Sequence, residues 1–312
     1  MQAQYRFSFG PWNIHEGADP FGPAVRPSLT FVDKLKLFRP LGYEGVQFHD
    51  DDAVPGVSGL DGAAVARKAA EVKAMLDGEG LVAAFVAPRL WEDERTIDGG
   101  YTSNDPACRA YAIERSLVAV DIARMLGTKL IVLWLAREGT YLREAKDSKR
   151  AVDQLAEAIN RMLAHDPEIK IAIEPKPNEP VDHTYIPTTG HVIALGHLCS
   201  DPARVGVNIE SAHAILAGLD PSDEMGFALA HGKQGRPRSR GQHRHGHRRP
   251  HSSVRHGRRC SLVDQPAGPE TFQRVGCIDL VRFIARDRVG KHVARPGRRL
   301  EPAGSPAAIH VQ

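Results

Sequence analysis

Two hydrophobic periods alternate along residues 5–233. Short apolar runs, typical of buried parallel strands, are followed by longer segments in which apolar residues recur every three or four positions, as on one face of a helix. Strands are predicted at residues 6–10, 45–49, 81–87, 129–134, 169–174 and 204–210. Helices are predicted at residues 106–126, 147–163, 188–199 and 213–230, and around two apolar sets, Val32, Leu35 and Phe38, and Val65, Val72 and Met75.

Six strand-helix units therefore follow one another without interruption. Such alternation implies an α/β fold with a parallel sheet and right-handed crossovers. A TIM (β/α)₈-type barrel is the leading prediction, in an incomplete form because only six units are visible. A parallel barrel collects functional side chains where its strands end, so strand ends are the places to search for chemistry.

The pattern stops after Lys233. Residues 231–312 contain 16 arginines and two lysines against five acidic residues, a balance of +13, whereas residues 1–230 have a balance of −10. Eight of the 15 histidines also lie in the last segment. Apart from a weak apolar cluster at residues 275–284, this segment lacks the apolar surface that offsets ordering entropy. Two domains are predicted: a partial barrel at 1–233 and an Arg/His/Pro/Gly-rich, low-order tail at 234–312.

Composition also restricts the setting. The chain has no apolar run long enough to span a membrane and no N-terminal secretory pattern. Its four cysteines are widely and irregularly spaced, which excludes a zinc motif or disulfide framework and fits a reducing compartment. A cytoplasmic protein is predicted.

One strand end is unusually stiff. Glu174, Lys176 and Glu179 alternate with Pro175, Pro177 and Pro180. Each proline fixes its own φ and pushes the preceding residue toward extended backbone, so these charges are predicted on a rigid, non-helical segment just past a strand. The alternative is a solvated polar loop, which an isolated Glu-Pro-Lys would favour.

Three further groups of residues follow strand ends. Glu210 and His213, three positions apart, have a spacing that suits one shared cation, and Glu174 is a third candidate ligand. This donor set favours Mg²⁺, Mn²⁺ or Co²⁺ over Zn²⁺, although His213 could simply begin a helix.

His49, followed by Asp50, Asp51 and Asp52, is a candidate acid or base. The alternative interpretation of this segment is a surface acidic loop. All three tryptophans, Trp12, Trp91 and Trp134, lie near strand ends, where they could wall a substrate or only pack the core.

These motifs together resemble the xylose isomerase family, in its shorter, actinobacterial-type class. The resemblance covers about residues 5–233. It is carried by Phe-His-Asp-Asp-Asp at 48–52, Ala-Ile-Glu-Pro-Lys-Pro-Asn-Glu-Pro at 172–180, and Val-Asn-Ile-Glu at 207–210 with His213. The string at 174–180 is the most specific of the three. Weaker matches include residues 19–22, 102–105 and 137–139.

The resemblance implies an aldose-ketose isomerase of the D-xylose to D-xylulose type that uses two divalent cations, most commonly Mg²⁺, to assist a hydride shift. His49 with Asp52 would assist ring opening, and Lys176 would contact the carbonyl oxygen. Glu174 and Glu210 would ligate one metal, and Glu210 and His213 the other. The resemblance further implies pocket walls at Trp12, Trp91 and Trp134, Phe21 reaching a neighbouring subunit, and a homotetramer.

The chain departs from this family after Lys233. The expected seventh and eighth strands with their metal-binding aspartates are missing, and Asp279 within Ile-Asp-Leu is a chance-grade match. A GC-rich gene translated out of frame yields such a change of composition, so a frameshift near Lys233 is our hypothesis. Glu16 and the triplet Ala87-Pro88-Arg89 also differ from the family, which has a tryptophan and a Thr-Thr-Asn run there.

Other functions stay open. A non-catalytic truncated barrel could bind nucleic acid or another polyanion through its basic tail, although the tail lacks interleaved aromatic residues and any known module. Another metal-dependent sugar epimerase or isomerase, or an apurinic endonuclease, could use similar carboxylates. Lys176 between two prolines favours a carbonyl-polarising role, which argues against an epimerase and against an endonuclease.

Overall fold

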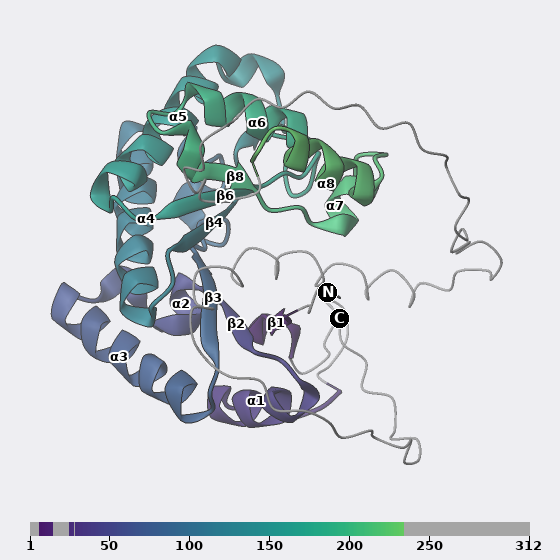
Figure 1. Ribbon diagram of the computed structural model, residues 1–312. Coiled ribbons are helices and arrows are strands. Elements are labelled where there is room, and N and C mark those ends of the chain that lie inside the picture. Colours follow the sequence, from purple (N-terminus) through teal and green to yellow (C-terminus); the bar gives the residue numbers. More distant parts are fainter. Residues whose placement is uncertain (1–5, 15–24, 28, 234–312) are drawn as a thin grey trace, which may run out of the picture.

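A six-stranded parallel sheet organises the computed structural model, which describes residues 6–14, 25–27 and 29–233. The strands lie side by side in chain order (Figure 1). They are β1 (Ser8–Phe9), β2 (Gly45–His49), β3 (Val82–Ala87), β4 (Leu130–Trp134), β6 (Lys170–Glu174) and β8 (Val205–Val207). The six predicted strands are thus confirmed, and the first and last are shorter than expected.

Side chains alternate between the two faces of this sheet. In β4, Ile131 and Leu133 join the large core under the helices, whereas Leu130 and Val132 join a second, smaller cluster. In β6, Ile171 and Ile173 belong to the large core. The second cluster occupies the face that becomes the interior when such a sheet curls into a barrel.

One irregularity lies between β2 and β3. The register shifts between Val46 and Gln47, so that these neighbours pair with Ala83 and Phe85 and skip Ala84. Ala84 and Phe85 consequently both belong to the smaller cluster, which breaks strict alternation. The extra residue, Ala84, belongs to β3, and a residue of this kind bends its strand and re-aims the side chains beyond it; β3 ends at Ala87, two positions before Arg89.

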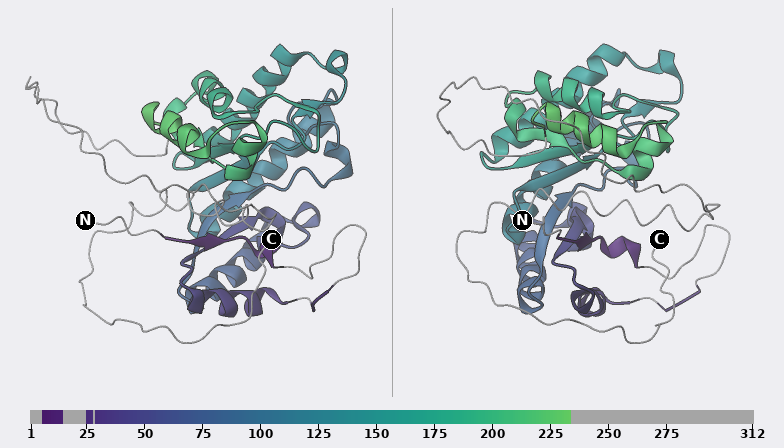
Figure 2. Two further views of the ribbon diagram at one scale, coloured as in Figure 1. Left: turned by 90° about the vertical axis from the view of Figure 1, so that its right-hand side faces the viewer. Right: turned by 45° about the vertical axis from the view of Figure 1, so that its right-hand side comes forward.

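Most helices form a row along one face of the sheet (Figures 1 and 2). Several begin with a polar residue that accepts a bond from a free amide, as Asp61, Asp105 and Asp147 do. The helices are α1 (Phe31–Phe38), α2 (Asp50–Ala53), α3 (Gly62–Gly78), α4 (Pro106–Leu126), α5 (Ser148–His165), α6 (Thr189–Leu198), α7 (Ser211–Leu216) and α8 (Pro221–Ala230).

Three details differ from the predicted elements. The last predicted helix is two helices, because Gly218 has a φ of 74° and Asp220 with Pro221 begins a new helix. Met75 was expected on the buried face of α3 but is 39% exposed, and Leu76 is buried there instead. The sequence also gave no sign of the antiparallel pair β5 (Gly139–Thr140) and β7 (His183–Thr184).

The edges of the sheet are β1 and β8 within the described residues. The backbone N–H of Val207 in β8 donates to the carbonyl of Lys233 at 3.4 Å, so the chain returns to this edge at Lys233. The predicted tail at 234–312, including its polyanion-binding role and the boundary after Lys233, lies outside the described residues. No described helix is long and apolar enough to cross a membrane.

A buried ion pair ties α4 to the end of β2. Asp50 has a fully buried side chain and receives two bonds from Arg115, from Nε at 2.7 Å and Nη2 at 3.0 Å. Its Oδ1 also accepts the backbone N–H groups of Arg89 and Asp51. Because a buried carboxylate is costly without partners, this pair fixes the segment that carries His49.

We expect Arg115→Met to lower the free energy of unfolding by about 3–5 kcal/mol, because Asp50 would remain buried without its cation. Urea denaturation followed by circular dichroism measures the loss. Arg124→Met removes an exposed arginine of the same helix and should change stability by less than about 0.5 kcal/mol. Equal effects of the two substitutions would contradict the assigned role of the pair.

Candidate active site

The strand register brings three polar side chains to one rim. Trp134 of β4 pairs with Glu174 of β6, and Ile173 pairs with Val207, which places Asn208 beside Glu174. The Asn208 amide donates from Nδ2 to Glu174 Oε2 at 2.7 Å. Parallel strands end at the same edge, so residues far apart in the chain meet there.

Glu174 is a largely buried carboxylate with little compensation. Its pKa is raised to about 8, chiefly by burial and then by the nearby Glu210, against the opposing effects of Asn208 and Lys176. Burial also raises the pKa of Glu210, whose Oε1 accepts the backbone N–H of Ala212 at 3.1 Å and so caps α7. Two partly desolvated carboxylates near each other favour protonation or a bound cation.

His213 lies beside Glu174 without a hydrogen bond. Its Nδ1 is 3.3 Å from Glu174 Oε1, but the direction is not that of a hydrogen bond, and this buried nitrogen has no hydrogen-bond partner in the described part of the chain. Burial lowers the pKa of His213 to about 4, with Lys176 adding to the effect. His213 is the third residue of α7, so it does begin a helix while also facing the carboxylate.

A row of rings joins His49 to His213. Neighbouring ring centroids are 4.2 Å apart for Trp12 and His49, 5.2 Å for His49 and Trp91, 4.5 Å for Trp91 and Trp134, and 6.3 Å for Trp134 and His213. All three tryptophans thus belong to the rim. The indole Nε1 of Trp134 is buried and has no partner among the described residues. Phe21 lies outside the described residues.

Lys176 occupies the proline-rich segment after β6, which is non-helical as predicted. Its side chain is 14% exposed, and its Nζ lies 3.3 Å from Glu179 Oε2 and 5.5 Å from the Trp134 ring centroid. The ammonium group is therefore held over an aromatic face near Glu174. Its positive charge lowers the pKa of the Glu174 carboxyl and the pKa of the His213 imidazole.

His49 belongs to a separate charged cluster. Its Nδ1 is 2.8 Å from Asp52 Oδ2, and the backbone N–H of His49 donates to the same carboxylate. His49, Asp51 and Asp52 have ligand atoms within 4.8 Å of one another, a spacing that a metal could use. The guanidinium of Arg89 contacts all three residues, however, so the positive charge of this cluster is already supplied.

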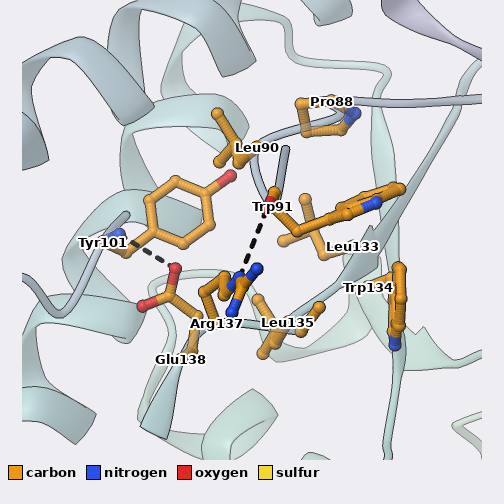
Figure 3. A pocket seen from close by; sticks show the side chains of 10 residues that line it. Pro88, Leu90, Trp91, Tyr101, Leu133, Trp134, Leu135, Arg137 and Glu138 are labelled. Atoms are coloured by element: carbon orange, nitrogen blue, oxygen red, sulfur yellow. Dashed lines mark hydrogen bonds between the residues drawn. The ribbon is translucent and has the colours of Figure 1, made fainter. Parts of the chain in front are cut away.

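Glu138 is a structural residue of the rim that the sequence did not reveal. Its buried carboxylate accepts the backbone N–H groups of Gly100, Tyr101 and Thr102 and the Thr102 hydroxyl, at 2.6–3.1 Å. Figure 3 shows it beside a small cavity that Trp91 and Trp134 also line. The position of Glu138 just after a predicted strand is the sequence signal that could have indicated it.

Similarity to known proteins decides the family. A family model described as "Xylose isomerase-like TIM barrel" matches residues 35–284. A xylose isomerase of Thermus caldophilus is 37% identical over 236 residues, which cover 74% of this chain. The chain belongs to the xylose isomerase-like TIM barrel family. The match to the family model runs past Lys233, where the resemblance described above ends.

The curated relatives are longer than the matched part. The Thermus caldophilus enzyme, and a xylose isomerase of Thermus thermophilus that is 36% identical over 236 residues, are each covered over 60% of their length. The barrel fold, expected from the strand-helix alternation, is confirmed by the family model.

Solved structures with other described activities share this fold. A 3-keto-D-glucoside 4-epimerase of E. coli has a TM-score of 0.51 at 12% identity and covers 73% of this chain and 76% of its own. A D-tagatose 3-epimerase-like protein has the same TM-score at 11% identity, covering 72% and 71%. At such identities the likeness shows a shared fold, which does not by itself assign a reaction.

The raised pKa of Glu174 predicts a pH dependence of stability. In the folded chain this group holds its proton up to about pH 8, above its usual 4.5, so its contribution is full at low pH and is lost as pH rises toward 8. His213 acts oppositely, because its pKa is lowered to about 4 from 6.5, and its contribution is complete once pH exceeds 6.5. The window from pH 6.5 to 8 therefore excludes the contribution of His213.

In that window we expect metal-free protein to lose stability, by a few kcal/mol at most. Glu174→Gln should reduce this pH slope, since the amide does not titrate. Urea denaturation in the presence of a chelator measures both slopes, with the exposed Glu168→Gln as a matched control. Parallel slopes in the wild type and Glu174→Gln would refute the assignment to Glu174.

Proposed function

We propose that the site is that of a metal-dependent aldose-ketose isomerase of the D-xylose to D-xylulose type. The observation that supports this best is the pairing of Glu174 and His213. A buried carboxylate with a raised pKa faces an unpartnered imidazole nitrogen, and Glu210 lies near enough to perturb the carboxylate. Oxygen donors with one histidine suit Mg²⁺, Mn²⁺ or Co²⁺.

Glu174, Glu210 and His213 would hold the cations. Bound there, a divalent cation supplies Lewis-acid polarisation of the sugar oxygens. Neutralising the two carboxylates would relieve the repulsion that raises the pKa of Glu174. Since His213 is neutral at physiological pH, it offers a free lone pair without first losing a proton.

The remaining residues would bind and orient the sugar. Lys176 would donate a hydrogen bond to the carbonyl oxygen, and its position over Trp134 limits the directions it can take. Trp12, Trp91 and Trp134 would exclude water, which favours hydride transfer over proton exchange. His49, with Asp52, would assist ring opening. A homotetramer with Phe21 in a neighbouring site and a cytoplasmic location stay predictions.

The region after Lys233 bears on turnover in this chain. The resemblance assigns further metal-binding aspartates to the region after Lys233, and the sequence there has none in the expected context. We therefore propose that residues 234–312 are frameshifted and that cation binding persists through Glu174, Glu210 and His213 while isomerisation is lost. The two claims are tested separately.

Cation binding is tested by titration calorimetry with Mn²⁺ and with Mg²⁺ on the full chain. We expect Glu174→Gln to weaken binding at least about tenfold, or about 1.4 kcal/mol, because one anionic ligand becomes neutral. Glu168→Gln changes an exposed glutamate just before β6 and should leave the affinity unchanged. Equal affinities for the wild type and Glu174→Gln would contradict the assigned ligand.

Isomerisation is tested by assaying aldose-to-ketose conversion with Mg²⁺ or Mn²⁺. We expect conversion only in a version in which one or two bases restore a family-like strand after Lys233. Equal rates in the two versions would show that the missing aspartates do not matter. Chromatography of the products distinguishes isomerisation from epimerisation, and salt-dependent retention on DNA tests the non-catalytic, polyanion-binding alternative.

A further inference from the structure

Arg89 contacts the same imidazole nitrogen as Asp52. Its Nη2 lies 2.6 Å from His49 Nδ1 and 2.9 Å from Asp52 Oδ1, while Asp52 Oδ2 lies 2.8 Å from that same Nδ1. Arginine only donates hydrogen bonds, and an ionised carboxylate only accepts them. Nδ1 of a neutral histidine is therefore satisfied by one of the two, never by both.

The surrounding contacts hold Arg89 in place. Its Nε donates to Asp51 Oδ1 at 2.9 Å, and its Nη1 donates to Glu92 Oε1 at 3.2 Å. Its backbone N–H donates to the buried Asp50 at 2.9 Å. The side chain is only 16% exposed, so these contacts hold the guanidinium group in one orientation beside His49.

Proton counting favours Arg89 as the partner of Nδ1. The two hydrogens of Nη2 match two acceptors, Asp52 Oδ1 and His49 Nδ1. Asp52 also accepts the backbone N–H of His49, so its carboxylate keeps two donors without the ring. In the opposite arrangement Nδ1–H would bond to Asp52, but the Arg89 cation would then have its Nη2 only 2.6 Å from a protonated nitrogen, which is repulsive.

We propose that Arg89 is a positioning residue that fixes the tautomer of neutral His49 with the proton on Nε2. Asp52 alone would hold the proton on Nδ1 and leave Nε2 as a base. With Arg89 present, His49 offers its Nε2–H as a hydrogen-bond donor instead. Its meaning for ring opening rests on the proposed isomerase function: His49 would donate to a sugar oxygen and would not remove a proton from a hydroxyl.

The sequence context makes this specific to the chain. Arg89 stands where the family resemblance expects the end of a Thr-Thr-Asn run, and neither residue type of that run carries a permanent charge. Burial opposes the charged form of Arg89, but Asp52 and Asp51 outweigh it and raise its pKa, so the donor is permanent. The cluster accordingly contains a fixed donor that a Thr-Thr-Asn run does not supply.

The tautomer is read directly by nuclear magnetic resonance. Long-range ¹H–¹⁵N correlation of ¹⁵N-histidine-labelled full-length protein distinguishes Nε2–H from Nδ1–H, at a pH above the titration midpoint of His49 observed in the same experiment. His49→Gln identifies the signal by its loss. We expect wild type to show Nε2–H, and a dominant Nδ1–H form would overturn the proposal.

Substitutions identify the residue responsible. We expect Arg89→Met to transfer the proton from Nε2 to Nδ1, where Asp52 becomes the acceptor, and Asp52→Asn to leave it on Nε2. The exposed Arg124→Met is the control and should change nothing. An unchanged tautomer in Arg89→Met would overturn the proposal.

If a variant does not fold, the wild-type spectrum by itself still tests the proposal. It also requires no turnover, so failure of the isomerase assignment and failure of the tautomer assignment remain distinguishable.

Discussion

The register of the parallel strands is the constraint on which the site depends. Trp134, Glu174 and Asn208 belong to three different strand ends, and they become neighbours because each strand pairs with the next in the same direction and in phase. A shift by one residue would turn each of these side chains to the opposite face, among the helices. The apolar residues that alternate with them, such as Ile173 and Leu133, prevent that shift by filling the large core.

Three buried carboxylates show how the structure uses this framework. Asp50 is neutralised by Arg115 and two backbone amides, and Glu138 is surrounded by three amides and a hydroxyl. Glu174 has one side-chain amide, that of Asn208, and faces Glu210 and an unpartnered nitrogen of His213. The first two carboxylates have a structural role. The third is left in need of positive charge, which is the signature expected of a ligand site.

The sequence predicted much of this arrangement for physical reasons. Buried parallel strands read as apolar runs, and helices with an aspartate cap and a terminal glycine are bounded by local chemistry, as Asp105 and Gly127 bound α4. Elements that depend on partners were less accessible. The short β5 and β7 pair has no local pattern of its own, and Met75 and Leu76 are adjacent apolar residues whose exposure depends on the exact phase of α3.

The sequence by itself determined the six strand-helix units, the residue types at their ends and the family, because these follow from hydrophobic period and from specific short motifs. Only the tertiary structure decided which groups meet. Arg89 and His49 are 40 positions apart in the chain, and Glu138 and Gly100 are 38 positions apart. No local sequence pattern encodes such contacts. Hydrogen-bond partners across strands depend on register and burial, and these exist only once the sheet has formed.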